Sequence, residues 1–111
     1  MGLMNRTMLA VAAACAMVSA PAFASGNAEQ GAKVAAEHCA RCHDISPDGK
    51  FKQYPPSFAS IAVFRAEDQI RGRILYPPQH ASMPQLGFVL TREEIDDLVA
   101  YIVSLDKGDA N

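Results

Sequence analysis

The sequence predicts an all-α fold of about three main helices joined by long loops. Three segments carry apolar residues at helical spacing, and no segment alternates between apolar and polar residues as a half-buried strand does. Proline pairs at 55–56 and 77–78 divide the helical segments from one another. The 111 residues suffice for one small domain and contain no internal repeat.

The first 24 residues are typical of a cleaved secretory signal peptide. Arg6 precedes an uncharged stretch from Leu9 to Ala20, and the small residues of Ala22-Phe23-Ala24 match the A-x-A cleavage pattern. A stretch of about 12 apolar residues is also too short to span a bilayer. We therefore expect cleavage to leave residues 25–111 as the functional domain, in the periplasm.

Loss of this leader changes the composition of the chain. Of the 111 residues 87 remain, and without Arg6 there are 9 basic residues against 12 acidic, a net charge of −3. A mildly acidic chain argues against a nucleic-acid-binding protein, and the absence of a later apolar stretch argues against stable membrane insertion. The alternative of a lipoprotein acylated at Cys15 would need an unusually short apolar core.

The first expected helix runs from Asn27 to about Ala40. Asn27 is a suitable N-cap, and Gln30 stands three residues later, where a capping box places its partner. One face of this helix is lined by mostly small residues, namely Gly31, Val34, Ala35, His38 and Cys39. Another element can therefore approach this face closely.

Two further helices follow a long loop. Residues 43–60 are expected to form the loop, the second helix covers Ala66–Leu75, and residues 77–90 are extended and irregular. The third helix begins after Thr91, which forms a capping box with Glu94. Its apolar face comprises Ile95, Leu98, Val99, Ile102 and Val103.

The sequence Cys39-Ala40-Arg41-Cys42-His43 is the C-x-x-C-H pattern of c-type haem attachment. Two thiols three positions apart near a helix end can each bond one haem vinyl group, and the next residue directs an imidazole at the iron. We therefore predict one covalent haem c on Cys39 and Cys42, with His43 as an iron ligand. A chain this small usually needs a stabilising element in addition to its hydrophobic core, such as a disulfide or a metal. The haem would be that element.

Other interpretations of these cysteines are less well supported. A thioredoxin-like dithiol belongs beside a βαβ pattern, and the sequence has no strand. A structural zinc site needs four ligands, and no second cysteine pair exists after the leader. A disulfide between Cys39 and Cys42 would close too small a loop to stabilise the fold appreciably, and it would leave His43 unexplained.

The sixth iron ligand separates an electron carrier from a haem enzyme, and Met83 is the leading candidate. It lies in Ser82-Met83-Pro84 and is the sole methionine after the leader, which weakens the reading that it only fills the core. His80 is the rival ligand, and a bis-His iron would have a lower potential. For His80 and His38 alike, the simpler interpretation is an exposed histidine.

With these residues, the chain resembles the small class I cytochromes c, the monohaem bacterial electron carriers. The likeness covers nearly all of residues 25–111, and its strongest element is C-x-x-C-H followed about 40 residues later by Met-Pro. It implies the cytochrome c fold, with long loops wrapped around one covalent haem, His43 as proximal ligand and Met83 as distal ligand. It further implies that Gly31 faces Tyr101 where the terminal helices cross.

The resemblance also implies a hydrogen bond from His43 to a proline carbonyl, for which Pro56 in Pro56-Ser57-Phe58 is the match. The sequence departs from the pattern in having no Trp to hold a propionate and no dense ring of lysines. Arg71 and Arg73 are candidates for propionate partners, although a solvated helix face is the simpler explanation for either one alone.

The expected function is one-electron transfer between redox partner proteins, as a free shuttle or as the cytochrome subunit of a periplasmic dehydrogenase. The partners would be such a dehydrogenase or a terminal oxidase or reductase, and the protein would not be an enzyme. The alternative is a haem enzyme or gas-binding protein with an open distal site. A basic patch (Lys50, Lys52, Arg71 and Arg73) could guide docking, whereas an acidic group (Glu93, Glu94, Asp96 and Asp97) is expected to cap and stabilise the last helix.

Overall fold

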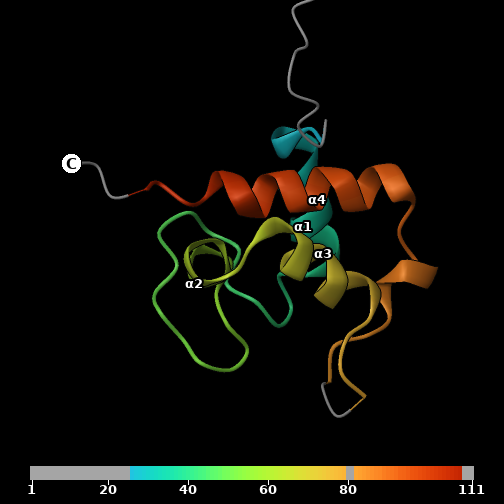
Figure 1. Ribbon diagram of the computed structural model, residues 1–111, viewed down its shortest axis with the longest axis horizontal. Coiled ribbons are helices and arrows are strands. Elements are labelled where there is room, and N and C mark those ends of the chain that lie inside the picture. Colours follow the sequence, from blue (N-terminus) through green and yellow to red (C-terminus); the bar gives the residue numbers. More distant parts are fainter. Residues whose placement is uncertain (1–25, 80–81, 109–111) are drawn as a thin grey trace, which may run out of the picture.

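The computed structural model describes residues 26–79 and 82–108, which form four α-helices and one 3-10 turn (Figure 1). The elements in chain order are α1 (Ala28–His38), α2 (Phe58–Phe64), α3 (Glu67–Leu75), η1 (Leu86–Phe88) and α4 (Arg92–Ser104). The described residues contain no strand, so the all-α prediction is confirmed. The predicted signal peptide, residues 1–24, and the rival ligand His80 lie outside the described residues.

α4 is the central element, because it contacts α1, α2 and α3. Its first turn has both hydrogen bonds of the predicted capping box: Glu94 N–H to Thr91 Oγ1 (3.1 Å) and Thr91 N–H to Glu94 Oε2 (2.8 Å). Its apolar face is buried as predicted, except that Val103 is 39% exposed. The buried residues of this face are Ile95, Leu98, Val99 and Ile102.

The crossing of α1 and α4 depends on glycine (Figure 1). A Cβ atom placed on Gly31 would overlap the backbone carbonyl of Asp97 and would lie 2.8 Å from the Cβ of Tyr101. A Cβ atom placed on Gly26 would likewise overlap the backbone carbonyl of Asp96. The expected approach of small residues on α1 to Tyr101 of the last helix is therefore present.

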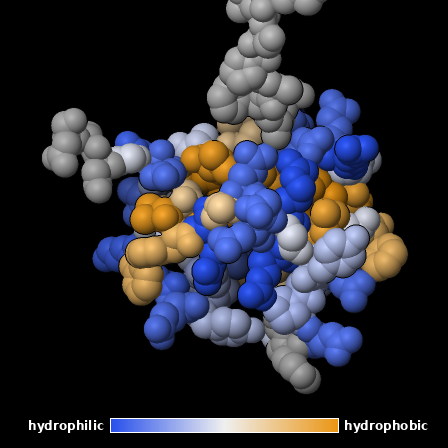
Figure 2. Space-filling model, in the orientation of Figure 1, coloured by the Kyte–Doolittle hydropathy of each residue, from blue (hydrophilic) through white to orange (hydrophobic). Residues whose placement is uncertain are grey.

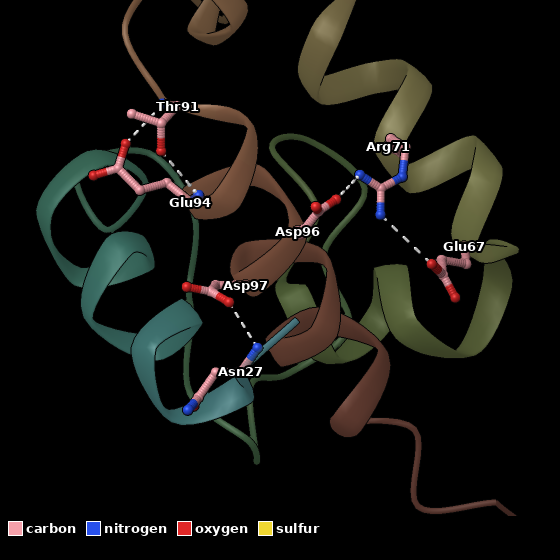
Figure 3. A network of polar contacts seen from close by, with 7 residues as sticks. All are labelled: Asn27, Glu67, Arg71, Thr91, Glu94, Asp96 and Asp97. Carbon is pink, nitrogen blue, oxygen red and sulfur yellow. Dashed lines mark hydrogen bonds and ion pairs between the residues drawn. The ribbon is translucent and has the colours of Figure 1, made fainter. Parts of the chain in front are cut away.

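The start of α1 differs from the prediction in one respect. Asn27 accepts a hydrogen bond from the N–H of Gln30 (3.1 Å), as expected of an N-cap. Its own N–H, however, donates to Oδ1 of Asp97 in α4 (2.6 Å) and not to the Gln30 side chain (Figure 3). A residue 70 positions away thus completes the cap, which the local spacing could not reveal.

The prediction of a loop over residues 43–60 is wrong at its end, because α2 begins at Phe58. The helix begins directly after Ser57, whose side chain accepts from the N–H of Ser60. Phe58, Ser60 and Ala62 are its buried residues. The prolines at 55–56 precede this helix and do not interrupt it, and a helix of seven residues is too short to show a clear period.

α3 follows the predicted range and is tied to α4 by Arg71. Its guanidinium Nη1 lies 2.5 Å from Asp96 Oδ1, and Nη2 lies 3.6 Å from Glu67 Oε1 (Figure 3). Arg71 is therefore engaged by two carboxylates, which offset its positive charge.

Three of the four acidic residues at the start of α4 have structural roles, but only the capping role of Glu94 was predicted from the sequence. Glu94 completes the capping box, Asp96 pairs with Arg71, and Asp97 accepts the N–H of Asn27, the N-cap residue of α1 (Figure 3). Among the described residues, no helix has the length and apolar character that crossing a membrane requires.

Candidate haem site

The C-x-x-C-H segment forms a tight turn at the end of α1. Cys39 is the C-cap residue and donates its N–H to the carbonyl of Ala35 (2.9 Å). The N–H groups of Cys42 and His43 then both donate to the carbonyl of Cys39 (3.1 and 2.9 Å). The turn therefore places the two cysteines and the histidine on one short, hydrogen-bonded piece of backbone.

The two cysteines are free thiols in different surroundings. Cys39 is buried in the core and Cys42 is exposed. Burial, with a smaller contribution from Cys42, raises the pKa of Cys39 to about 11. A redox-active dithiol has a lowered thiol pKa, so the environment of Cys39 is the opposite of the one that such chemistry needs.

His43 is oriented by a hydrogen bond from its ring. Nδ1 donates to the carbonyl oxygen of Pro56 across 2.7 Å, and the half-buried ring lies against Phe58 with centroids 5.4 Å apart. The acceptor is Pro56 and not the neighbouring Pro55, so the bond implied by the resemblance is present. Because Nδ1 carries the proton in this bond, Nε2 remains available as a donor to a metal.

The loop after His43 is tied to both α2 and α4. The N–H of Phe58 donates to the carbonyl of Asp44 (2.9 Å), and the hydroxyl of Tyr101 donates to the carbonyl of Ile45 (2.5 Å). The Phe58 and Tyr101 rings also contact each other, with centroids 6.4 Å apart. These contacts fix the position of His43 relative to the core.

Two titratable side chains border this loop. Hydrogen bonds from the side chain and the backbone N–H of Ser46 lower the pKa of Asp44. Burial, together with the nearby charge of Asp44, raises the pKa of Tyr101. Tyr101 is therefore a neutral hydroxyl donor to the loop at neutral pH.

Met83 lies between α3 and η1, and its half-buried side chain packs against the hydrophobic core. The same core contains Cys39 and Phe58. The structure thus brings Met83, which is 40 residues beyond His43, onto the buried cluster to which Cys39 of the C-x-x-C-H turn also belongs.

Large apolar side chains are exposed on the segments that flank these residues. Figure 2 shows them in two groups separated by hydrophilic side chains, one over α2 and the C-terminal end of α4 and the other over η1 and the N-terminal end of α4. Phe51 and Phe64 pack edge to face, 5.8 Å apart, and both rings are more than 60% exposed. The other strongly exposed residues are Tyr54, Val63, Tyr76, Phe88 and Val89.

The donor set fits a haem c. Two free thiols, an imidazole whose second nitrogen is engaged by a carbonyl, and a thioether on a proline-flanked segment are the groups that a covalent haem with two axial ligands uses. Sequence reasoning identified these residues, but it missed Ser57, Ser60 and the Tyr101–Ile45 bond, because no local pattern relates them to His43.

Comparison with known proteins assigns the family. A family model described as cytochrome C oxidase, cbb3-type, subunit III matches residues 26–102. No curated protein and no solved structure gives a significant match. The all-helical arrangement is that of the expected cytochrome c fold, and a domain of this kind transfers electrons on haem c. The chain thus belongs to the c-type cytochromes, in the family described as cytochrome C oxidase, cbb3-type, subunit III.

Proposed function

We propose that residues 25–111 carry one electron at a time on a single, covalently attached haem c. Cys39 and Cys42 would hold the group through thioether bonds, and His43 and Met83 would bind its iron. The hydrogen bond from His43 Nδ1 to Pro56 is the observation that carries this proposal, because it prepares Nε2 to bind iron. The haem iron supplies the one-electron Fe(II)/Fe(III) couple when bound.

The two thiols have complementary roles. Each thiol would add across one vinyl group of the haem, with sulfur bonding to one carbon and hydrogen going to the other, so the attachment would need no oxidant. Cys39 is buried and would join the haem to the core, whereas Cys42 is exposed and would join it to the surface turn. Attachment therefore joins the surface turn at the end of α1 to the hydrophobic interior.

The two axial ligands affect the redox equilibrium in opposite directions. The Pro56 carbonyl makes the His43 imidazole more basic, which favours Fe(III). The thioether of Met83 favours Fe(II) and raises the potential relative to a bis-His iron. With both positions taken by the chain, the protein is an electron carrier and not an enzyme.

The partners are redox proteins in the periplasm, to which the predicted signal peptide would export the chain. The description of the family names an oxidase subunit, which is compatible with a terminal oxidase as acceptor. A periplasmic dehydrogenase, with this chain as a free shuttle or as its cytochrome subunit, is an equally compatible donor. Transient redox complexes use small interfaces, and the exposed apolar side chains around Phe51 and Phe88 offer such contacts.

Replacement of Met83 by Ala tests the axial ligand. The ferric holoprotein should lose its methionine-to-iron charge-transfer band. Its reduction potential should fall by on the order of 0.1 V or more, since axial ligands set haem potentials over about 0.8 V. Optical spectroscopy and a redox titration of the purified holoprotein measure both.

His80→Ala is the matched control, because His80 is the rival ligand. It should leave both the band and the potential nearly unchanged. The opposite pattern, in which His80→Ala shifts the potential and Met83→Ala does not, would assign the iron to two histidines.

A further inference from the structure

We propose that the buried hydroxyl pair of Ser57 and Ser60 positions the carbonyl group that holds His43, and thereby helps to set the reduction potential of the haem iron. This inference rests on the proposed function, since it takes His43 as an iron ligand. Ser57 follows Pro56 directly, and Ser60 lies in the first turn of α2. Both serines act through Pro56 and are therefore positioning residues.

The two hydroxyl groups form a closed unit inside the protein. Their oxygen atoms lie 2.7 Å apart, Ser57 is fully buried and Ser60 is 9% exposed. Ser57 Oγ also accepts the N–H of Ser60 (3.2 Å), which is the N-cap bond of α2. A buried polar pair of this kind is restricted in movement because any rotation leaves a hydroxyl without a partner.

Ser57 is coupled to His43 through a single peptide plane. The carbonyl of Pro56 and the nitrogen of Ser57 belong to one planar unit, so a rotation of this plane moves the oxygen that accepts the His43 proton. The proline ring already restricts φ of Pro56. The remaining rotation is about ψ of Pro56, and the position of Ser57 at the start of α2 limits it.

The same segment is held from its other side. Phe58 donates its N–H to the carbonyl of Asp44 (2.9 Å), which is the residue after His43. The loop packs closely here, since a Cβ placed on Gly49 would lie 3.2 Å from the Cβ of Ser57 and from the Cγ of Asp44. The Ser57 cap and the Phe58 bond thus jointly fix the acceptor for His43.

The orientation of this acceptor affects the iron because the Nδ1 hydrogen bond determines how basic the imidazole is. A well-aligned bond to a carbonyl increases the electron density that Nε2 donates and favours Fe(III). If the Pro56 carbonyl turns away, the bond weakens and Fe(II) is favoured. The serine pair therefore keeps the potential lower than a loosely held loop would.

Ser57→Ala in the full holoprotein tests the proposal. The reduction potential should rise. The His43 Nδ1 proton, observed by NMR in the ferrous protein, should exchange with solvent roughly three- to tenfold faster, which corresponds to the weakening of one ordinary hydrogen bond. Ser60→Ala, which removes the hydroxyl partner but keeps the backbone N-cap bond, should shift both quantities in the same direction by less.

Thr91→Ala is the matched control. Thr91 caps α4 in the way that Ser57 caps α2, by accepting an N–H three residues later, but it does so away from His43. Its loss should reduce stability and leave the potential and the His43 exchange rate unchanged. Ser57→Thr keeps the hydroxyl but adds a methyl group at a fully buried position, so it should lose stability and yet keep both values close to those of the unmodified protein.

Two results would overturn the proposal. One is that the Ser60→Ala protein, and the Ser57→Ala protein if it folds, are less stable but have an unchanged reduction potential and an unchanged exchange rate of the His43 Nδ1 proton. The other is that Thr91→Ala shifts the potential as much as the serine variants do. Failure of the proposed function can be distinguished from failure of this inference. An unmodified protein without a methionine charge-transfer band would contradict Met83 as ligand, but the His43 exchange rate could still be measured in the serine variants.

Discussion

His43→Ala should prevent the accumulation of a stable holoprotein. The change removes the proposed iron ligand and also the hydrogen bond to Pro56, which joins the C-x-x-C-H turn to the start of α2. Loss of an outer partner of a metal ligand alone typically costs about 10- to 100-fold in metal affinity, so loss of the ligand itself should exceed this. The yield of folded protein with covalent haem, measured by absorbance after export, is the test.

His38→Ala is the control for this experiment. His38 is the last residue of α1, directly before Cys39, and is half-buried. Its Nε2 lies 3.7 Å from Oε1 of Glu37. Its replacement should leave the yield and the spectrum near those of the unmodified protein. Normal accumulation of the His43→Ala holoprotein with an unchanged spectrum would exclude His43 as the ligand.

Gly31→Ala should destabilise the fold strongly although alanine is the better helix former. The added Cβ would overlap the backbone carbonyl of Asp97 and press on the Cβ of Tyr101, and neither atom is the flexible end of a side chain. We expect a loss of about 3 kcal/mol, at the upper end of the usual range for overpacking. This is a large part of the roughly 5–15 kcal/mol that stabilises a typical domain.

Gly72→Ala is the matched change in another helix. Apart from its chain neighbours and the backbone of α3 itself, no described atom lies within 4 Å of a Cβ placed on Gly72, which is inside α3. Alanine should therefore stabilise the protein by about 0.5–1 kcal/mol through its helix propensity. Chemical denaturation of the two holoproteins, followed by circular dichroism, measures both signs, and a Gly31→Ala protein as stable as the unmodified one would contradict the close crossing of α1 and α4.

The predictable parts of the fold were those that the local sequence encodes. The Thr91 capping box, the apolar face of α4 and the range of α3 all follow from short spacings, and the structure has them. The sequence does not predict α2, because seven residues show no clear period, and because a proline pair argues against a regular helix although here it only precedes one. The contact of Asp97 with Asn27 spans 70 residues, so no local pattern could contain it.

The candidate site likewise has one part that the sequence predicts and another that only the structure shows. Cys39, Cys42 and His43 are adjacent in the sequence, so their chemistry can be recognised without a structure. The partner of His43 was reached through a resemblance, and the bond to Pro56 is present in the structure. The roles of Ser57 and of the Tyr101–Ile45 bond cannot be predicted from the sequence. Ser57 matters because it is next to the Pro56 carbonyl, and Tyr101 because its hydroxyl donates to the Ile45 carbonyl.

The most direct test of the central claim, that the chain itself occupies both axial positions of the iron, is addition of CO to the ferrous holoprotein at neutral pH. With His43 and Met83 both bound, CO has no free position, and the optical spectrum should remain unchanged. Prompt formation of a CO complex by the unmodified protein would show an open distal site and would contradict the assignment of this chain as an electron carrier.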